Sequence, residues 1–185
     1  GENAVKDKPA NIQIPVLAPL DTFTALLVAG MQGHQVSVSY ADVFKADTAK
    51  IAPIAETECS GPVGAALAQG MSDYASLPEH PNSLAGYGRN QDNFMSIPVI
   101  NNFLIKDSQP GTKKLKHPVN IKQGEKDATV PKAATDLLIA SAEAKGTKIQ
   151  YKPDAEWTHS TVYTANINQF VIDVKLMMPT TTPIP

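Results

Sequence analysis

The stretch that decides the fold is HPVNIKQGEKDATVPKAATDLLIASAEAKGTKIQYK, residues 117–152. Residues 117–124 predict a strand, and a polar turn follows it. Residues 132–144 predict a helix that ends at a glycine, and residues 148–152 predict a second strand. A strand, a helix and a strand in this order predict a parallel pair with a right-handed crossover, and therefore an α/β fold.

Two helices should cover this sheet. The helix at 132–144 is expected to turn four apolar side chains inward: Ala133, Leu137, Leu138 and Ala140. A last helix is predicted over residues 160–177, after a loop that contains Trp157-Thr158-His159. Its apolar residues are Val162, Ile167, Phe170, Val171, Val174 and Met178.

The first part of the chain predicts a strand followed by helices. Residues 11–18, NIQIPVLA, alternate and then become continuously apolar, which is typical of a strand that enters a buried sheet. Asp21 is expected to cap a helix that ends near Gly30 or Gly33. Phe23, Leu26, Leu27 and Met31 lie at helical spacing in it. A weak helical pattern covers 36–50 and a further run covers 63–74 after the breaker Ser60-Gly61-Pro62, while 77–93 predicts a loop.

Composition narrows the class of protein. The chain has 185 residues, 42% of them apolar, which is enough to fill a core. A formal charge of −2 gives no electrostatic signature for nucleic acid or for an anionic membrane. The polar first residues contain neither a signal-peptide pattern nor a membrane anchor, and we expect no transmembrane segment. The single cysteine, Cys59, excludes an internal disulfide and a cysteine-based zinc site.

Asp127 and His159 are the candidate catalytic residues. Each follows a predicted strand, at the sheet edge where the carboxyl ends of parallel strands meet. A carboxylate that accepts from the Nδ1–H of an imidazole leaves Nε2 to take a proton from a nucleophile. The competing interpretations are that Asp127 only forms a turn and caps the following helix, and that His159 only precedes a helix and has no chemical function.

Other titratable side chains are weaker candidates. Asp154 and Glu156 lie on the loop of the histidine and are expected to be solvated, and Glu125 is a competitor of Asp127 for His159. The remaining histidines stand alone in the sequence and are expected to be structural or on the surface: His34, His80 and His117.

The order of acid and then histidine on the last two strands resembles the α/β-hydrolases. The sequence GEKDATVP, the helix, the strand and AEWTH, together with the 32-residue interval from Asp127 to His159, resemble most closely secretory lipases of the Candida antarctica lipase A type. The segment DTFT at 21–24 is similar to the entry into the lid of that family.

The resemblance implies an α/β-hydrolase fold with a mainly helical lid or cap insertion. Residues 1–20 would enter the hydrolase core, 21–110 would form the lid or cap, and 111–185 would be the C-terminal core. It implies a secreted carboxylic ester hydrolase or lipase for which Asp127 is the triad acid and His159 the general base. The substrates would be esters or lipids of the acylglycerol type, and no metal or cofactor is implied.

The nucleophile is missing from this sequence. No Gly-x-Ser-x-Gly segment occurs in it. In the lipases that it resembles, the nucleophile precedes the equivalent of residue 12, so the resemblance implies an N-terminal hydrolase portion as partner. Cys59 is interpreted either as a buried small hydrophobe or as half of a disulfide to that portion, and the resemblance favours the disulfide.

The function of the apolar segments stays open at this stage. Six residues are candidates for a lid or an acyl pocket: Phe23, Leu26, Leu27, Met31, Phe94 and Ile97. Ordinary core packing explains such stripes equally well. For the whole chain, the alternatives to the esterase are a hydrolase-like binding or structural module without a nucleophile and a related serine hydrolase, a deacetylase or peptidase.

Overall fold

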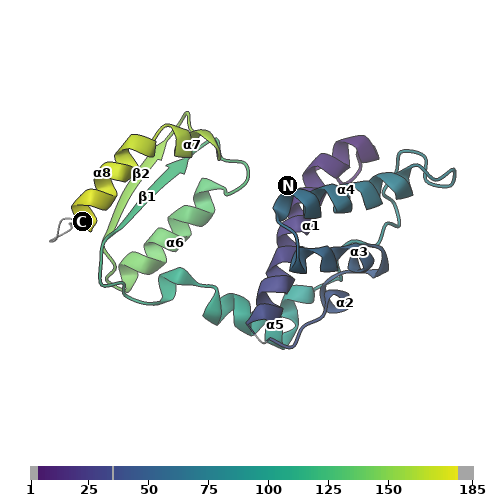
Figure 1. Ribbon diagram of the computed structural model, residues 1–185, viewed down its shortest axis with the longest axis horizontal. Coiled ribbons are helices and arrows are strands. Elements are labelled where there is room, and N and C mark those ends of the chain that lie inside the picture. The colour runs from purple at the N-terminus through teal and green to yellow at the C-terminus, as the bar shows by residue number, and fades with distance from the viewer. Residues whose placement is uncertain (1–3, 35, 179–185) are drawn as a thin grey trace, which may run out of the picture. The chain divides into compact units, whose positions relative to one another are not determined.

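The chain forms two compact units, Gly1–Asp107 and Ser108–Pro185, which we call unit 1 and unit 2 (Figure 1). The computed structural model describes residues 4–34 and 36–178. Unit 1 is helical in its described residues, and unit 2 contains a parallel sheet with its helices. The division lies a few residues before residue 111, where the sequence placed the start of the C-terminal core.

Unit 1 is built around α1 (Ala10–Gly33), and the strand predicted at 11–18 is wrong because these residues belong to this helix. The buried positions Leu17, Asp21, Ala25 and Val28 follow one another at intervals of four, four and three residues, which is helical spacing. One member of this series is an aspartate, so a search for apolar residues alone misses the helical period. The predicted end at Gly33 is confirmed.

Asp21 is not a helix cap, as the sequence predicted, but a buried residue in the middle of α1. Its two carboxylate oxygens accept hydrogen bonds from Arg89, with Nε at 2.9 Å from Oδ2 and Nη2 at 2.7 Å from Oδ1. A buried carboxylate is stable only when it is paired, and the partner here lies 68 residues away. Local sequence patterns therefore did not reveal this pair.

The remaining described helices of unit 1 pack against α1 or against one another. They are α2 (Tyr40–Val43), α3 (Ala46–Ile51), the 3₁₀ helix η2 (Ala52–Glu56), α4 (Ser60–Ala75), the 3₁₀ helix η3 (Phe94–Ser96), α5 (Pro98–Asn102) and the π-helical turn η4 (Phe103–Asp107). The predicted helix at 63–74 is confirmed as part of α4. The pattern at 36–50 splits into short helices because Phe44 leaves the helical conformation and pairs with Asn90 in an isolated β-bridge.

Unit 2 contains the predicted strand, helix and strand. β1 (Val119–Gly124) pairs in parallel with β2 (Ile149–Asp154), in a register that aligns Val119 with Ile149 and Gly124 with Asp154. α6 (Lys132–Ala144) has the predicted bounds and connects the two strands. The 3₁₀ helix η5 (Pro110–Thr112) precedes β1. The parallel pair and its connecting helix are confirmed.

The helices of unit 2 lie on the two faces of this sheet (Figure 1). On one face, Thr135 of α6 donates from Oγ1 to Oε1 of Gln123 at 2.6 Å. On the other face, Nζ of Lys122 lies 3.0 Å from Oδ2 of Asp173. Because neighbouring residues of a strand point to opposite faces, α6 and the helix that carries Asp173 enclose β1 between them.

Two predictions about these helices are wrong. In α6, Ala133, Leu137 and Ala140 are exposed and Leu138 is half-buried, whereas Thr135, Ile139 and Ala142 are buried. The threonine faces the sheet because its hydroxyl bonds Gln123. The last helix is broken into α7 (Thr161–Thr164) and α8 (Ile167–Met177), and between them Asn166 donates from Nδ2 to the Val162 carbonyl at 2.7 Å.

Among the described helices, α1 alone is long and apolar enough to cross a membrane by length and composition. Core helices of soluble proteins and signal sequences have the same property. In this chain α1 carries the buried pair of Asp21 with Arg89 and packs against the core of unit 1.

Candidate functional site

The candidate site is made by two loops that leave the carboxyl ends of β1 and β2. Beyond the strands, Glu125 N donates to the Asp154 carbonyl at 2.9 Å, and Lys126 N donates to the Trp157 carbonyl at 3.1 Å. These bonds hold the two loops together, so residues 32 positions apart in the sequence meet.

Asp127 lies in the first of these loops, and its carboxylate is held at both oxygens. Oδ1 accepts from the backbone N–H groups of Thr129 at 2.9 Å and Val130 at 2.8 Å. Oδ2 lies 3.0 Å from Nδ1 of His159. The side chain of Asp127 is 6% exposed. Asp127 therefore forms a local turn and also contacts the histidine. Its interpretation as a cap of the following helix is wrong, because α6 begins after Pro131 without a side-chain cap.

The surroundings of Asp127 favour its ionised form. Burial raises the pKa of this carboxyl group, but the N–H of Val130, the imidazole of His159 and the N–H of Thr129 lower it, and the net shift is downward. An ionised carboxylate can only accept, so the imidazole donates from Nδ1. The neutral ring then has Nε2 as its free acceptor, which is the tautomer that a general base requires.

His159 is at the open side of the pair. Its side chain is 56% exposed, and of the described residues only Asp127 forms a hydrogen bond with its ring. The turn that carries it is fixed by Thr158 and Thr161: the N–H of Thr158 donates to the Thr161 hydroxyl at 2.7 Å, and the N–H of Thr161 donates back to the Thr158 hydroxyl at 3.3 Å. The ring is therefore anchored at Nδ1 and accessible elsewhere.

A buried hydrogen-bond network supports the loop of Asp127. Gln123, on β1, accepts from Thr135 and donates from Nε2 to the carbonyl oxygen of Val130 at 3.0 Å. This bond holds the residue whose N–H binds Asp127. The network thus links α6 and β1 to the orientation of the carboxylate.

The other titratable candidates lie apart from this pair. Glu156 forms an exposed ion pair with Lys126 at 2.5 Å, and Asp154 accepts from the N–H of Glu156 at 2.9 Å. Glu125 is exposed. His80 stacks on Tyr74 in unit 1, with ring centroids 4.1 Å apart. In the part of the chain that the structure describes, no cluster of three or more His, Cys, Asp or Glu residues could hold a metal ion.

The candidate lid residues all belong to unit 1, and five of them contribute to its core. Met31 is buried in the main hydrophobic cluster, and four half-buried residues pack against that cluster: Leu26, Leu27, Phe94 and Ile97. Phe23 is 55% exposed. Core packing accounts for the five, and their contribution to an acyl pocket stays a prediction.

Cys59 is exposed and precedes the first residue of α4. The interpretation of Cys59 as a buried small hydrophobe is therefore wrong. Its exposed thiol is compatible with a bond to another polypeptide, which stays a prediction.

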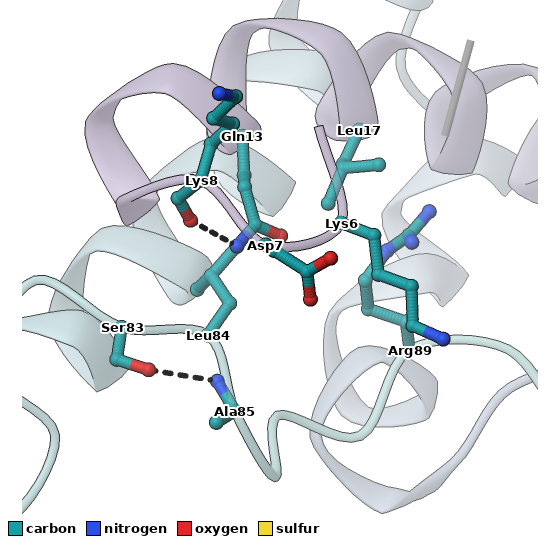
Figure 2. A pocket seen from close by; sticks show the side chains of 9 residues that line it. All are labelled: Lys6, Asp7, Lys8, Gln13, Leu17, Ser83, Leu84, Ala85 and Arg89. Atoms are coloured by element: carbon teal, nitrogen blue, oxygen red, sulfur yellow. Dashed lines mark hydrogen bonds between the residues drawn. The ribbon is translucent and has the colours of Figure 1, made fainter. Parts of the chain in front are cut away.

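Unit 1 contains a cavity of about 440 Å³, and Figure 2 shows the side chains that line it. None of its lining residues belongs to unit 2, which carries Asp127 and His159. Polar groups in its wall bond to the chain itself: Gln13 donates from Nε2 to the Lys8 carbonyl at 2.6 Å, and the Ser83 hydroxyl accepts from the N–H of Ala85 at 3.1 Å. The wall is formed by Lys6, Asp7, Lys8, Gln13, Leu17, Ser83, Leu84, Ala85 and Arg89. Ser83 supplies the one hydroxyl group among these lining residues, and no histidine accompanies it there.

Comparison with models of known protein families, with curated proteins and with solved structures gave no match to this chain. The residues of the chain and their geometry are therefore the basis on which its function is inferred.

Sequence reasoning missed the residues that position the pair. Gly124 ends β1 in close contact with the Trp157 backbone, and a glycine at a strand end is the usual signal of such an approach. Gln123 and Thr135 gave no signal, because a polar residue within an apolar segment is identified as a buried partner only once the contact is known. Thr158 and Thr161 flank His159 at a spacing of three, which is the pattern of a local cap.

Proposed function

We propose that this chain supplies the acid and the general base of a secreted serine hydrolase that cleaves carboxylic esters. The observation that carries the proposal is the 3.0 Å contact between Asp127 Oδ2 and His159 Nδ1, with Asp127 Oδ1 bound by two backbone N–H groups. The resemblance to secretory lipases favours an acylglycerol-type substrate and an α/β-hydrolase fold for the assembled enzyme.

The proposed reaction is a two-step acyl transfer. His159 Nε2 takes the proton of a serine hydroxyl as its oxygen attacks the ester carbonyl, and it then gives that proton to the departing alcohol. In the second step His159 takes a proton from the water that attacks the acyl-enzyme, and it returns that proton to the serine oxygen as the acid is released. Asp127 holds the ring in the required tautomer and stabilises the imidazolium.

The serine belongs, in this proposal, to an N-terminal hydrolase portion, because this sequence has no Gly-x-Ser-x-Gly segment. The same absence favours the second candidate, a binding module with hydrolase-like architecture and no catalysis. A fluorophosphonate probe distinguishes the two, since it reacts only with an activated serine. If the chain is part of an enzyme, a polypeptide labelled by the probe should co-purify with it. If the chain is a binding module, it should purify without a labelled polypeptide.

Substitution of His159 tests the role of the base. In the assembled protein, His159→Ala should lower ester hydrolysis by about four orders of magnitude and abolish fluorophosphonate labelling. The matched control is His117→Ala, which removes an exposed histidine just before β1 and should leave both signals unchanged. The fluorescence of Trp157 verifies that the variants are folded. Retained turnover in the His159 variant would disprove the assignment.

A further inference from the structure

Residues 113–118 and 145–148 form a basic cluster, which we call the lysine cluster, at the end of the sheet opposite the candidate site. The first segment precedes β1 and the second precedes β2, and both arrows in Figure 1 begin at this end of the sheet. β1 has six residues, so at about 3.3 Å per residue its two ends lie about 17 Å apart. The cluster is therefore separate from the pair of Asp127 and His159.

Thr147 joins the two segments of the lysine cluster. This residue is 3% exposed, and its hydroxyl accepts from the N–H of Leu115 at 2.9 Å and donates to the Lys113 carbonyl at 3.4 Å. The N–H of Val119 also donates to the Lys148 carbonyl at 3.0 Å. These bonds hold the backbones of the two segments side by side.

The lysine cluster contains no acidic residue. Its segments KKLKHP and KGTK hold five lysines and one histidine, and all six are exposed. The ion pairs that join described residues of unit 2 use none of these lysines: they are Lys122 with Asp173, Lys126 with Glu156, Lys132 with Asp136, and His159 with Asp127. The charge of the cluster is therefore not neutralised within the part of unit 2 that the structure describes.

A cavity of about 250 Å³ lies between the two segments. Its titratable lining residues are Lys114, Lys116, His117 and Lys148, and the other lining residues are apolar or glycine. The side chain of Lys114 lies across Gly146, with Nζ 3.8 Å from the place that a Cβ of that residue would occupy. The cavity thus collects basic side chains from both segments and has no carboxylate in its wall.

An ordinary cause explains only one lysine of the cluster. Lys145 directly follows α6, and a positive charge is favourable beside the C-terminus of a helix. That effect is confined to the last turn, whereas Lys116 belongs to the other segment and Lys148 lies beyond the turn at Gly146. Lysines that serve only solubility are interspersed with acidic residues over a surface, not collected around one cavity.

We propose that this cavity binds a small phosphate dianion, either inorganic phosphate or a soluble phosphate monoester. The ammonium groups of Lys114, Lys116 and Lys148 would donate charge-assisted hydrogen bonds to its oxygens. Its two negative charges would relieve the mutual repulsion of the lysines more than a monovalent carboxylate would. The cavity is smaller than the usual sites for drug-sized molecules, so the ligand is small. This site does not depend on the proposed function.

The charge of the whole chain favours a soluble phosphate over the phosphate of a lipid headgroup. The chain has a formal charge of −2, so an extended anionic surface would meet a net repulsion. A small anion inside the cavity is affected mainly by charges within about 10 Å, because salt screens the more distant ones. The local excess of lysines therefore favours an ion that enters the cavity.

Phosphorus NMR of inorganic phosphate tests the site. The phosphate is added at neutral pH and constant ionic strength to the assembled protein, that is, this chain with any polypeptide that co-purifies with it. The phosphate signal should broaden saturably, and an equal concentration of acetate should not reverse the broadening. Absence of saturation, or competition by acetate as effective as that by unlabelled phosphate ester, would overturn the site.

Substitutions locate the phosphate in the cavity. Lys114→Gln and Lys148→Gln should each raise the dissociation constant of phosphate by about tenfold, because each removes a charge-assisted hydrogen bond. The matched control is Lys175→Gln, which removes an exposed lysine of α8 outside the cavity and should change this constant by less than about twofold. Equal weakening in the three variants, or none, would overturn the site. Trp157 fluorescence verifies folding.

Vesicles of phosphatidylcholine and phosphatidic acid distinguish the two sources of the phosphate group. These vesicles present a phosphate monoester on a surface, and the protein should not sediment with them. Sedimentation that is lost in the Lys148→Gln variant would overturn the choice of a soluble ligand.

Discussion

Gly124 lies so close to Trp157 that a Cβ on the glycine would overlap the carbonyl group of the tryptophan. The same carbonyl accepts a hydrogen bond from Lys126 N at 3.1 Å. The end of β1 and the loop before His159 can make this contact only because residue 124 has no side chain. Asp127 and His159 lie within three residues of these two contacts, so the distance between their side chains depends on this glycine.

Gly124→Ala should therefore separate the two loops. We expect the free energy of unfolding to fall by about 1–3 kcal/mol, because the added methyl group meets backbone atoms that have little room to move. Urea denaturation followed by Trp157 fluorescence measures this, since Trp157 is the single tryptophan. The matched control is Gly61→Ala, where no atom lies within 4 Å of the new Cβ. Equal free energies of unfolding of the two variants would disprove that the contact between the loops requires a glycine at position 124.

The lowered pKa of Asp127 predicts a loss of stability in acid. The stabilising contribution of this carboxylate is complete above its ordinary pKa of 3.8 and disappears as the pH falls through the lower pKa of the folded state. Asp127→Asn should remove this part of the pH dependence, so that the variant and the parent converge in stability at low pH. The control is Asp92→Asn, which removes the carboxylate of an exposed ion pair. In this variant the free energy of unfolding should depend on pH as it does in the parent. Urea denaturation at a series of pH values measures the slopes.

The sequence predicted unit 2 better than unit 1, for a physical reason. In unit 2 the order of strand, helix and strand follows from local patterns and from turn residues such as Gly146, which has a positive φ of 87° after α6. The loops that carry Asp127 and His159 then meet because parallel strands end at one edge. Connectivity alone is sufficient for that inference.

In unit 1 the decisive interaction is not local. The helical series of α1 contains Asp21, which is buried because Arg89 neutralises it from 68 residues away. Without that contact, an aspartate after Pro19 is read as a helix start, and the residues before it are read as a strand. The error at 11–18 thus has two causes: the burial of Asp21 by a long-range ion pair, and Pro15 and Pro19, which lie inside α1 although proline disfavours a helix interior.

The inward face of α6 was also predicted wrongly, and Thr135 explains why. Its hydroxyl is buried against Gln123, so a polar residue occupies a position that an apolar pattern assigns to leucine. Leu137 is instead 75% exposed. A pattern of apolar residues locates the helix but gives no information on such a buried polar pair.

Thr135→Val tests the importance of this pair. The substitution keeps the shape of the side chain but leaves Oε1 of the buried Gln123 without its donor, which should lower the free energy of unfolding by about 1–3 kcal/mol. Gln123 also donates to the Val130 carbonyl, and the N–H of Val130 donates to Asp127. Loss of the network should therefore accelerate hydrogen exchange at the Val130 amide. Thr164→Val, on the exposed surface of α7, should change the stability by less than about 0.5 kcal/mol. An equal effect of both variants would show that the network contributes nothing.

Arg89→Ala should be the most destabilising of these substitutions, because it leaves the carboxylate of Asp21 buried without its guanidinium. The expected loss is about 3–5 kcal/mol. Far-UV circular dichroism during urea denaturation reports on it, because the helices of unit 1 dominate the signal. Arg89→Lys keeps the charge but not the two-point contact, so its loss should be smaller. Asp92→Ala removes half of an exposed ion pair and should cost about 1 kcal/mol or less. If Arg89→Ala were no more harmful than Asp92→Ala, the ion pair would not make the expected contribution to the stability of unit 1.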